Sequence, residues 1–259
     1  MRDYHVVSFS GGKDSTAMLL HMLELDMPID DIVFIDTSIE FPAMYEHIDK
    51  VEKYIGIKIT RLKAEYDFEY YLLVAPPLGV KAKQRAIEKN CSGIGFPMGV
   101  TRWCTSTLKT NVMNKYFRLH RDKNILQYIG IAYDEQKRVK DKVYPLVDWK
   151  WTEKDCLSYC YDKGFDFGGL YNYFNRVSCW CCYMQSLQDL RMLREHFPDL
   201  WDKLKEWENK SWNNFKQNYT IPQLEIRFDL EKEWQNKGLS PSMRNKEFKK
   251  EFFRRISLT

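Results

Sequence analysis

Short apolar runs alternate with longer segments of helical spacing through the first half of the chain. Four runs suit buried parallel strands, which are almost continuously hydrophobic, and they cover residues 5–9, 31–36, 57–62 and 125–131. The helical segments between them cover residues 13–25, 42–54 and 105–120. This alternation predicts an α/β fold built on a doubly wound, mainly parallel sheet.

A second part of the chain begins near Tyr144, where the pattern changes to helices separated by short turns. We therefore expect an α/β domain in residues 1–143 and a helical lobe in residues 144–259. In open α/β sheets, ligands bind beyond the carboxyl ends of the strands. Three segments follow predicted strands and are expected at that edge: residues 10–15, 36–40 and 133–138.

The composition indicates a folded protein, with 44% hydrophobic residues in a chain of 259. The formal net charge is only +4, which by itself does not imply a nucleic-acid partner. Residues 203–259 carry thirteen Lys and Arg against eight Asp and Glu, so the excess lies in this tail. Helices expected at residues 204–215 and 245–256 either pack on their own domain or bind a polynucleotide. Packing is the favoured reading, and the aromatic residues it concerns are Trp207, Trp212, Trp234, Phe248, Phe252 and Phe253.

Hydropathy predicts a cytoplasmic protein without a membrane partner. No apolar run approaches the roughly 18 residues of a membrane span, and the first strand begins without a signal-like segment before it. In a reducing compartment, seven cysteines favour metal binding or catalysis over a disulfide framework. Cys156 and Cys160 lie four residues apart in a predicted helix and are expected to line its inner face as small hydrophobes.

The sequence SFSGGKDS, Ser8 to Ser15, joins the first strand to the first helix. A strand, a glycine turn and a helix start form an anion site, because free N–H groups at a helix N-terminus point along a favourable dipole. A Walker A loop needs a different glycine spacing, so this is a shorter phosphate loop. A purely structural turn leaves Lys13, Asp14 and Ser15 without a role.

The loop resembles the PP-loop of the N-type ATP pyrophosphatases. Further motifs follow in order, namely FIDTSIEFP (34–42), RWCTSTLK (102–109), GIAYDEQKR (130–138), YPLVDW (144–149) and RVSCWCC (176–182). Together they resemble the phosphoadenosine phosphosulfate (PAPS) reductase-like branch of that superfamily. Three residues depart from the family pattern: Ser38 replaces a glycine, Ala132 an arginine and Tyr183 a proline.

The resemblance implies an adenine nucleotide alpha hydrolase-like fold whose first domain binds ATP and Mg²⁺. It implies that ATP is split between the α and β phosphates to adenylate an acceptor, with Lys13, Asp14 and Arg138 as catalytic residues. An alternative for Asp36 or Thr37 is that they cap the next helix, which is compatible with ligand contact. The expected nucleotide-binding residues are Ser8, Ser10, Gly11, Gly12, Lys13, Asp14, Ser15, Asp36, Thr37, Glu40, Arg102 and Glu135.

The resemblance also implies a metal centre held by Cys104, Cys179 and Cys182, with Cys91 as the fourth ligand. Thiolates serve a [4Fe–4S] cluster or Zn²⁺ equally well, and their spacing does not choose between these. The alternative is that the adjacent cysteines are ordinary core residues. Cys181 is the weaker ligand candidate because it alternates away from the centre.

Three functions remain open at this stage. The preferred one is an ATP pyrophosphatase that adenylates an acceptor, in sulfur transfer or a related modification. The alternatives are a thiol- or Fe–S-dependent (phospho)adenylyl sulfate reductase and a non-catalytic nucleotide- or nucleic-acid-binding module. The reductase is disfavoured because the loop is complete and no cysteine follows Cys182. Expected partners are a nucleotide, an acceptor that includes nucleic acid among the options, a sulfur donor protein and a second copy of the chain.

Overall fold

The computed structural model describes residues 2–99 and 101–258. Contacts divide the chain into two compact units. Unit 1 comprises Met1–Phe68 and Arg102–Cys182, and unit 2 comprises Glu69–Thr101 and Tyr183–Thr259. The domain boundary expected after residue 143 stays a prediction, since compact units need not be folding domains; residues 144–182 group with the sheet in unit 1.

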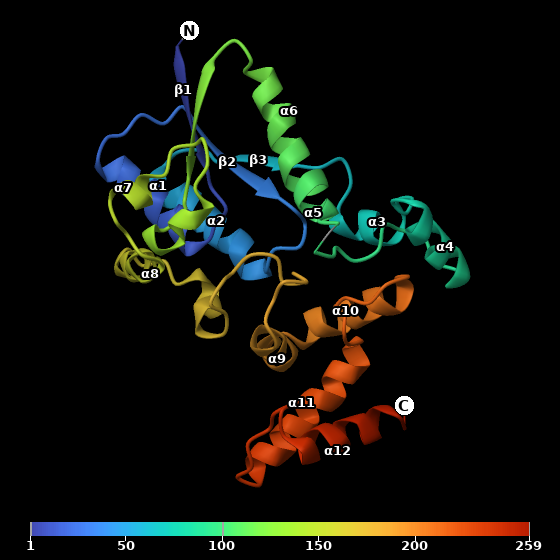
Figure 1. Ribbon diagram of the computed structural model, residues 1–259. Coiled ribbons are helices and arrows are strands. Elements are labelled where there is room, and N and C mark those ends of the chain that lie inside the picture. Colours follow the sequence, from blue (N-terminus) through green and yellow to red (C-terminus); the bar gives the residue numbers. More distant parts are fainter. Residues whose placement is uncertain (1, 100, 259) are drawn as a thin grey trace. The chain divides into compact units, whose positions relative to one another are not determined.

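The sheet of unit 1 confirms the predicted doubly wound α/β fold. Four strands pair in parallel in the order β3-β2-β1-β4, so the chain moves one way from β1 and later returns to its other side (Figure 1). The strands are β1 (Asp3–Ser8), β2 (Asp31–Asp36), β3 (Thr60–Lys63) and β4 (Asn124–Ile129). The predicted strand at residues 57–62 starts too early, because Gly56 ends the preceding helix in a left-handed conformation and Ile57 is exposed.

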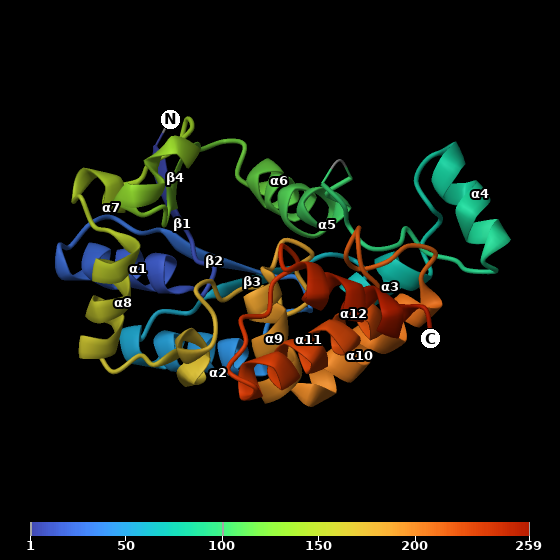
Figure 2. The same cartoon turned by 60° about the horizontal axis from the view of Figure 1, so that its bottom comes forward.

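Alternate strand residues face two layers of helices. Val7 and Phe34 pack with α1 (Lys13–Glu24), α2 (Pro42–Ile55) and α8 (Glu153–Asp162) on one face. Val6 and Val33 pack with α6 (Asn111–Leu119) on the other. The two views of the ribbon show α6 on the side of the sheet away from α1 and α8 (Figures 1 and 2). Cys156 and Cys160 are fully buried on α8, which confirms their predicted place in the core.

The helix predicted at residues 105–120 begins two residues earlier and is irregular. It starts as α5 (Trp103–Thr105), continues as a π-helical turn at Ser106–Thr110 and ends as α6. Single π-turns inside helices occur often at functional sites. Here the turn carries the second half of the RWCTSTLK motif.

Other short elements complete unit 1. They are the 3₁₀ turn Tyr133–Arg138, α7 (Pro145–Asp148) and the 3₁₀ segment Phe167–Asn172, which is broken by left-handed Gly168 and Gly169.

Unit 2 is helical, as expected for the tail. Its elements are α3 (Phe68–Leu73, of which Phe68 belongs to unit 1), α4 (Val80–Glu88), α9 (Leu187–His196), α10 (Pro198–Lys210), α11 (Ile221–Asn236) and α12 (Lys246–Ile256). The helix predicted at residues 204–215 is displaced, because Pro198 starts α10 and the chain turns after Lys210 so that Glu208 accepts the Phe215 N–H.

Five of the six tail aromatics pack within the fold, as predicted. Trp207, Trp212, Phe248 and Phe252 are buried and Trp234 is half-buried against the cluster of Phe248 and Phe252, whereas Phe253 is 51% exposed. None of the helices in the described residues is both long and apolar enough to cross a bilayer.

Candidate functional site

The glycine loop lies at the carboxyl end of β1, where the sheet order reverses. Gly11 has a φ of 78°, and a Cβ there would lie 3.0 Å from the Met44 side chain, so the position requires glycine. Gly12 is the N-cap of α1 in an extended conformation and makes no side-chain cap hydrogen bond. The first N–H groups of α1 are therefore left for the loop's other partners or a ligand.

Two hydroxyls close the loop from inside. Ser10 Oγ and Ser15 Oγ lie 3.0 Å apart, and Ser15 Oγ also accepts from the Ser10 N–H at 3.2 Å. Gly130, the residue after β4, packs directly behind them: a Cβ there would lie 2.8 Å from both N and Cα of Ser15. The end of β4 thus sets the position of the loop backbone.

Lys13 is buried and its ammonium is held by two carboxylates. Its Nζ donates to Glu153 Oε1 at 3.0 Å and lies 3.4 Å from Asp14 Oδ2. The Lys13 N–H donates to the Tyr171 hydroxyl at 2.8 Å. Lys13 has two groups that could bind an anion. Its ammonium donates to Glu153 and its backbone N–H donates to Tyr171.

Asp14 is the least satisfied charged group of the loop. Its Oδ1 is buried and has no hydrogen-bond partner among the described residues. Burial raises the pKa of Asp14 to about 6; the Lys13 charge opposes the shift, and Glu153 and Glu135 add to it. A cation beside Oδ1 would stabilise the charged carboxylate and lower its pKa.

The segment after β4 brings more charge to the same end of unit 1. Arg138 donates to Glu135 at 2.5 Å, and Arg176 lies 3.9 Å from the same carboxylate. Asp134 Oδ1 accepts the Glu153 N–H, so this segment also holds the first residue of α8. Arg102 is exposed and caps α5 without a side-chain hydrogen bond.

The acidic segment after β2 is organised by its own hydrogen bonds. Glu40 accepts from the Thr37 N–H and hydroxyl, and Asp36 accepts from the Ser38 N–H and the Tyr45 hydroxyl. The alternative in which Asp36 or Thr37 caps α2 is wrong, because Phe41 is the N-cap and no side chain caps it.

Ser38, which departs from the family's glycine, has a φ of 64°. This backbone conformation favours glycine, so the substitution is strained. Its hydroxyl compensates by accepting the Phe68 N–H and donating to the Thr37 carbonyl.

The cysteine motif is joined to this acidic segment. Glu40 and Cys179 form an antiparallel bridge, and the Trp180 N–H donates to the Ile39 carbonyl at 2.9 Å. The Thr37 hydroxyl lies 3.8 Å from Cys179 Sγ. One bridge of backbone thus connects the edge of the sheet to the cysteines.

Four thiols of unit 1 lie close enough to affect one another's pKa, namely those of Cys104, Cys179, Cys181 and Cys182. Burial raises the pKa of Cys179 and Cys104, and each is also raised by the charge of Cys182, while Lys109 opposes both shifts. Cys181 is buried and its pKa is raised well above the ordinary value, first by burial and then by Cys179. Cys179 in turn raises the pKa of Lys109.

Two further observations limit the metal prediction. Cys91 belongs to unit 2, where its Sγ donates to the Lys89 carbonyl, so its role as fourth ligand stays a prediction. In the part of the chain that the structure describes, no group of three or more His, Cys, Asp or Glu side chains is arranged to hold a single metal ion.

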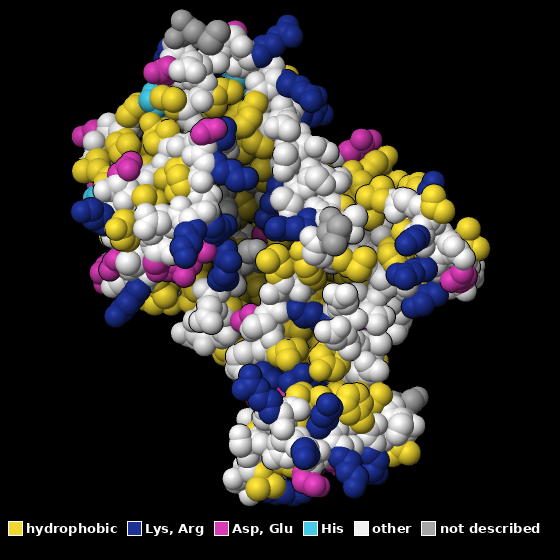
Figure 3. Space-filling view, viewed as in Figure 1, with side chains coloured by type: hydrophobic (Ala, Val, Ile, Leu, Met, Phe, Trp, Pro, Cys, Tyr) yellow, Lys and Arg dark blue, Asp and Glu magenta, His cyan; other side chains and the backbone are white. Residues whose placement is uncertain are grey.

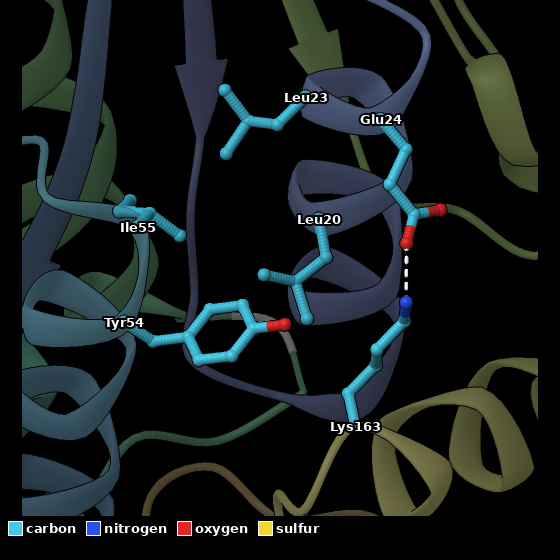
Figure 4. A pocket seen from close by; sticks show the side chains of 6 residues that line it. All are labelled: Leu20, Leu23, Glu24, Tyr54, Ile55 and Lys163. Carbon is cyan, nitrogen blue, oxygen red and sulfur yellow. Dashed lines mark ion pairs between the residues drawn. The ribbon is translucent and has the colours of Figure 1, made fainter.

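A separate pocket of about 290 Å³ lies between α1 and α2 (Figure 4). It is mainly apolar, with the Glu24–Lys163 ion pair at one side, and none of its residues was predicted to be functional. Its lining residues are Leu20, Leu23, Glu24, Tyr54, Ile55 and Lys163.

The family model of the phosphoadenosine phosphosulfate reductase domain matches residues 4–185 of the chain. The chain therefore belongs to this family, which confirms the resemblance seen in its motifs.

Similarity to curated proteins is more distant. An uncharacterised protein of Methanocaldococcus jannaschii is 29% identical over 79% of this chain, and a second one from the same organism is 26% identical over 94%. The chain spans 40% and 54% of the length of these relatives. An adenosine 5'-phosphosulfate reductase of Geobacillus is 26% identical over 67% of this chain and 72% of its own length.

Two solved structures show a weaker likeness, each with 16% sequence identity. A PAPS reductase from Candida auris in a phosphate complex has a TM-score of 0.44, covering 70% of this chain and 82% of its own. The U34-tRNA thiolase NcsA from Methanococcus maripaludis, with its [4Fe–4S] cluster, has a TM-score of 0.40, covering 80% of this chain and 68% of its own.

Sequence reasoning missed several residues around the loop. Glu153 and Tyr171 lie 140 and 158 positions from Lys13, and neither belongs to a motif quoted above. Glu153 falls in a helix-capping sequence, which predicts only a helix start. Arg176 lies inside the RVSCWCC motif, but the motif gave no sign that its side chain approaches Glu135.

Proposed function

We propose that the chain binds ATP in the Ser10–Ser15 loop and transfers its adenylyl group to an acceptor. The observation that carries the proposal is the buried Lys13 ammonium at the start of α1, beside the paired hydroxyls of Ser10 and Ser15. This arrangement offers a cation, backbone N–H groups and hydroxyls to one anion.

In the proposed reaction, an acceptor oxygen attacks the α phosphorus of ATP. The bond from that phosphorus to the α–β bridging oxygen breaks, pyrophosphate leaves with the electron pair, and the acceptor proton goes to solvent. Lys13 and the loop N–H groups stabilise the charge that grows on the leaving group. Arg138 and Arg176, which both contact Glu135, are proposed to bind further phosphate oxygens.

The residues fit the Mg²⁺ that accompanies ATP. Asp14 has a buried carboxylate oxygen that finds no hydrogen-bond partner among the described residues, and its pKa is raised by burial and then by the charges of Glu153 and Glu135. Mg²⁺ is usually held by one or two carboxylates together with substrate phosphates, so three clustered protein ligands are not required. When bound, the ion would neutralise phosphate charge.

Cys104, Cys179 and Cys182, with Cys91, are proposed to hold a [4Fe–4S] cluster or Zn²⁺. The mutual influence of the first three thiols and the nearby Lys109 support a site for soft, anionic ligands. Thiolates that hold a cluster lie farther apart than the ligands of one ion, so a cluster does not require the single-ion arrangement that the described residues lack. Such a centre would supply sulfur or redox chemistry; sulfur transfer and a sulfur donor protein are part of the proposal.

A reductase that releases sulfite from an adenylyl sulfate is the second candidate. The named Geobacillus relative supports it. The complete loop favours ATP, because it offers more anion contacts than a substrate without a β phosphate needs.

The test uses labelled ATP with candidate acceptors. AMP and pyrophosphate are expected, and ADP with phosphate as the only products would reject the proposal. Incubation with adenylyl sulfate and a dithiol, followed by sulfite assay, tests the second candidate. ATP binding without any turnover would favour a nucleotide-binding module. Cytoplasmic location and self-association remain predictions; fractionation and light scattering test them.

A further inference from the structure

α4 presents an unusually open basic surface in unit 2. Ala86 is its only buried residue, and Lys81, Lys83, Arg85 and Lys89 are all exposed at or just after the helix. None of these four has a carboxylate of the described residues within ion-pair distance. Figure 3 shows basic side chains gathered over α4 at the right of the view.

Three of these side chains form a row. Lys81, Arg85 and Lys89 are spaced by four residues, so they share one side of the helix at intervals of about 6 Å. The nearest acid on the helix, Glu88, accepts a hydrogen bond from Gln84. The row is thus a line of cations that a regularly charged polyanion can follow.

Two arginines of the basic tail differ from the cations of α4. Arg254 pairs with Glu251 at 2.7 Å, and Arg255 pairs with Glu233 at the same distance. Lys249 and Lys250 of the tail are exposed and, like the four cations of α4, have no ion pair among the described residues. What distinguishes α4 is therefore that all four of its cations are unpaired and that three of them are evenly spaced.

We infer that the row Lys81, Arg85 and Lys89 binds the phosphodiester backbone of a nucleic acid. Free cations at regular spacing match phosphates in charge and gain affinity by releasing counterions. A lipid surface fits less well, because the exposed apolar side chains of α4 are only Val80 and Ile87. The claim that this surface binds a nucleic acid is independent of the proposed function. The further claim that this nucleic acid is the acceptor of the reaction rests on the proposed function.

The test measures binding of fluorescent single-stranded RNA, single-stranded DNA and duplex DNA to the full chain, without ATP, across a salt series. Three phosphate contacts predict that log K falls with log salt by a slope of about −2 for single strands. The variant Lys81→Glu, Arg85→Glu, Lys89→Glu is expected to lose at least about 100-fold in affinity near 0.1 M salt and most of the slope.

The matched control reverses three exposed lysines elsewhere in unit 2, Lys232→Glu, Lys237→Glu and Lys249→Glu, and should keep most of the binding. Circular dichroism checks each fold, and the alanine version of the α4 variant replaces it if the fold is lost. The inference is overturned if the wild-type chain binds no polynucleotide at low salt, if both variants lose affinity equally, or if only phosphatidylserine vesicles bind. ATP binding, measured separately, reports on the proposed function alone.

Discussion

The ammonium of Lys13 donates a hydrogen bond to Glu153 across a sequence separation of 140 residues. The loop lysine is therefore paired with the first residue of α8, and under the proposed function a phosphate of ATP would compete with that carboxylate. Glu153 and the loop both belong to unit 1, so the competition between Glu153 and phosphate for Lys13 would take place within this one unit.

Glu153→Gln is expected to strengthen ATP binding about three- to tenfold, since a neutral amide competes less well for Lys13 and ion pairs of this kind contribute on the order of 1 kcal/mol. Calorimetric titration with ATP, with and without Mg²⁺, measures the effect. Weaker binding only in the presence of Mg²⁺ would show instead that Glu153 faces the ion.

Lys13→Ala should slow ATP cleavage by about 2.7 to 4 kcal/mol in activation free energy, by analogy with the loss of a group that stabilises a developing anion. The measurement is the rate of pyrophosphate release at saturating ATP. Lys154→Ala is the control, because Lys154 is exposed on the same α8 segment. Equal rates for the two variants would remove Lys13 from the reaction.

Asp14 predicts a pH effect on stability. Its pKa is raised to about 6 in the folded chain from 3.8, mainly by burial, so the folded state binds the proton more tightly than the unfolded state. Stability should therefore fall as pH rises from about 4 to about 6, by up to about 3 kcal/mol, and then level off. Denaturant unfolding at several pH values should show that Asp14→Asn removes this fall. An identical pH profile for both proteins would contradict the assignment.

Gly130→Ala should disturb the loop without touching any ligand. The added Cβ meets the backbone of Ser15, which has no flexible end to move aside, so we expect a stability loss of about 1 to 3 kcal/mol and much weaker ATP binding. Gly99→Ala is the control, since a Cβ there meets nothing within 4 Å. Normal ATP affinity in the Gly130 variant would show that β4 does not position the loop.

Local patterns were enough to predict the sheet and the loop. Apolar runs predicted the four strands, and the glycines predicted the turn between β1 and α1, because both depend on residues adjacent in the chain. The phosphate-binding role of this turn stays a prediction. Two element boundaries were predicted wrongly. β3 begins later than expected because Gly56 ends α2, and α10 begins earlier than expected because Pro198 starts it.

Partners far apart in the chain were not predictable from pattern. Nothing in the residues around Glu153 or Tyr171 indicates contact with Lys13, since packing of α8 and the following segment on α1 decides it. The same holds for the tail: composition showed its basic residues, but only folded contacts show that Arg254 and Arg255 are paired.

The last prediction concerns the cysteines. Cys104→Ala, Cys179→Ala and Cys182→Ala should each lower bound iron or zinc together with the yield of folded protein, because metal binding and folding are coupled. Cys91→Ala tests the proposed fourth ligand, and Cys181→Ala tests whether the buried Cys181 thiol takes that role. Anaerobic purification followed by metal analysis and an absorption spectrum distinguishes a cluster from zinc.

Cys156→Ala is the matched control, because Cys156 is also a thiol of unit 1 but lies buried on α8. There its pKa is raised by burial and then by the charges of Asp14 and Cys160. It should cost some stability by leaving a small cavity, while metal content per folded chain stays unchanged. A stable, metal-free wild-type chain whose thiols at positions 91, 104, 179 and 182 all react freely would refute the metal centre. Loss of metal in the Cys156 variant as well would mean that the measured metal reports folding and not ligation.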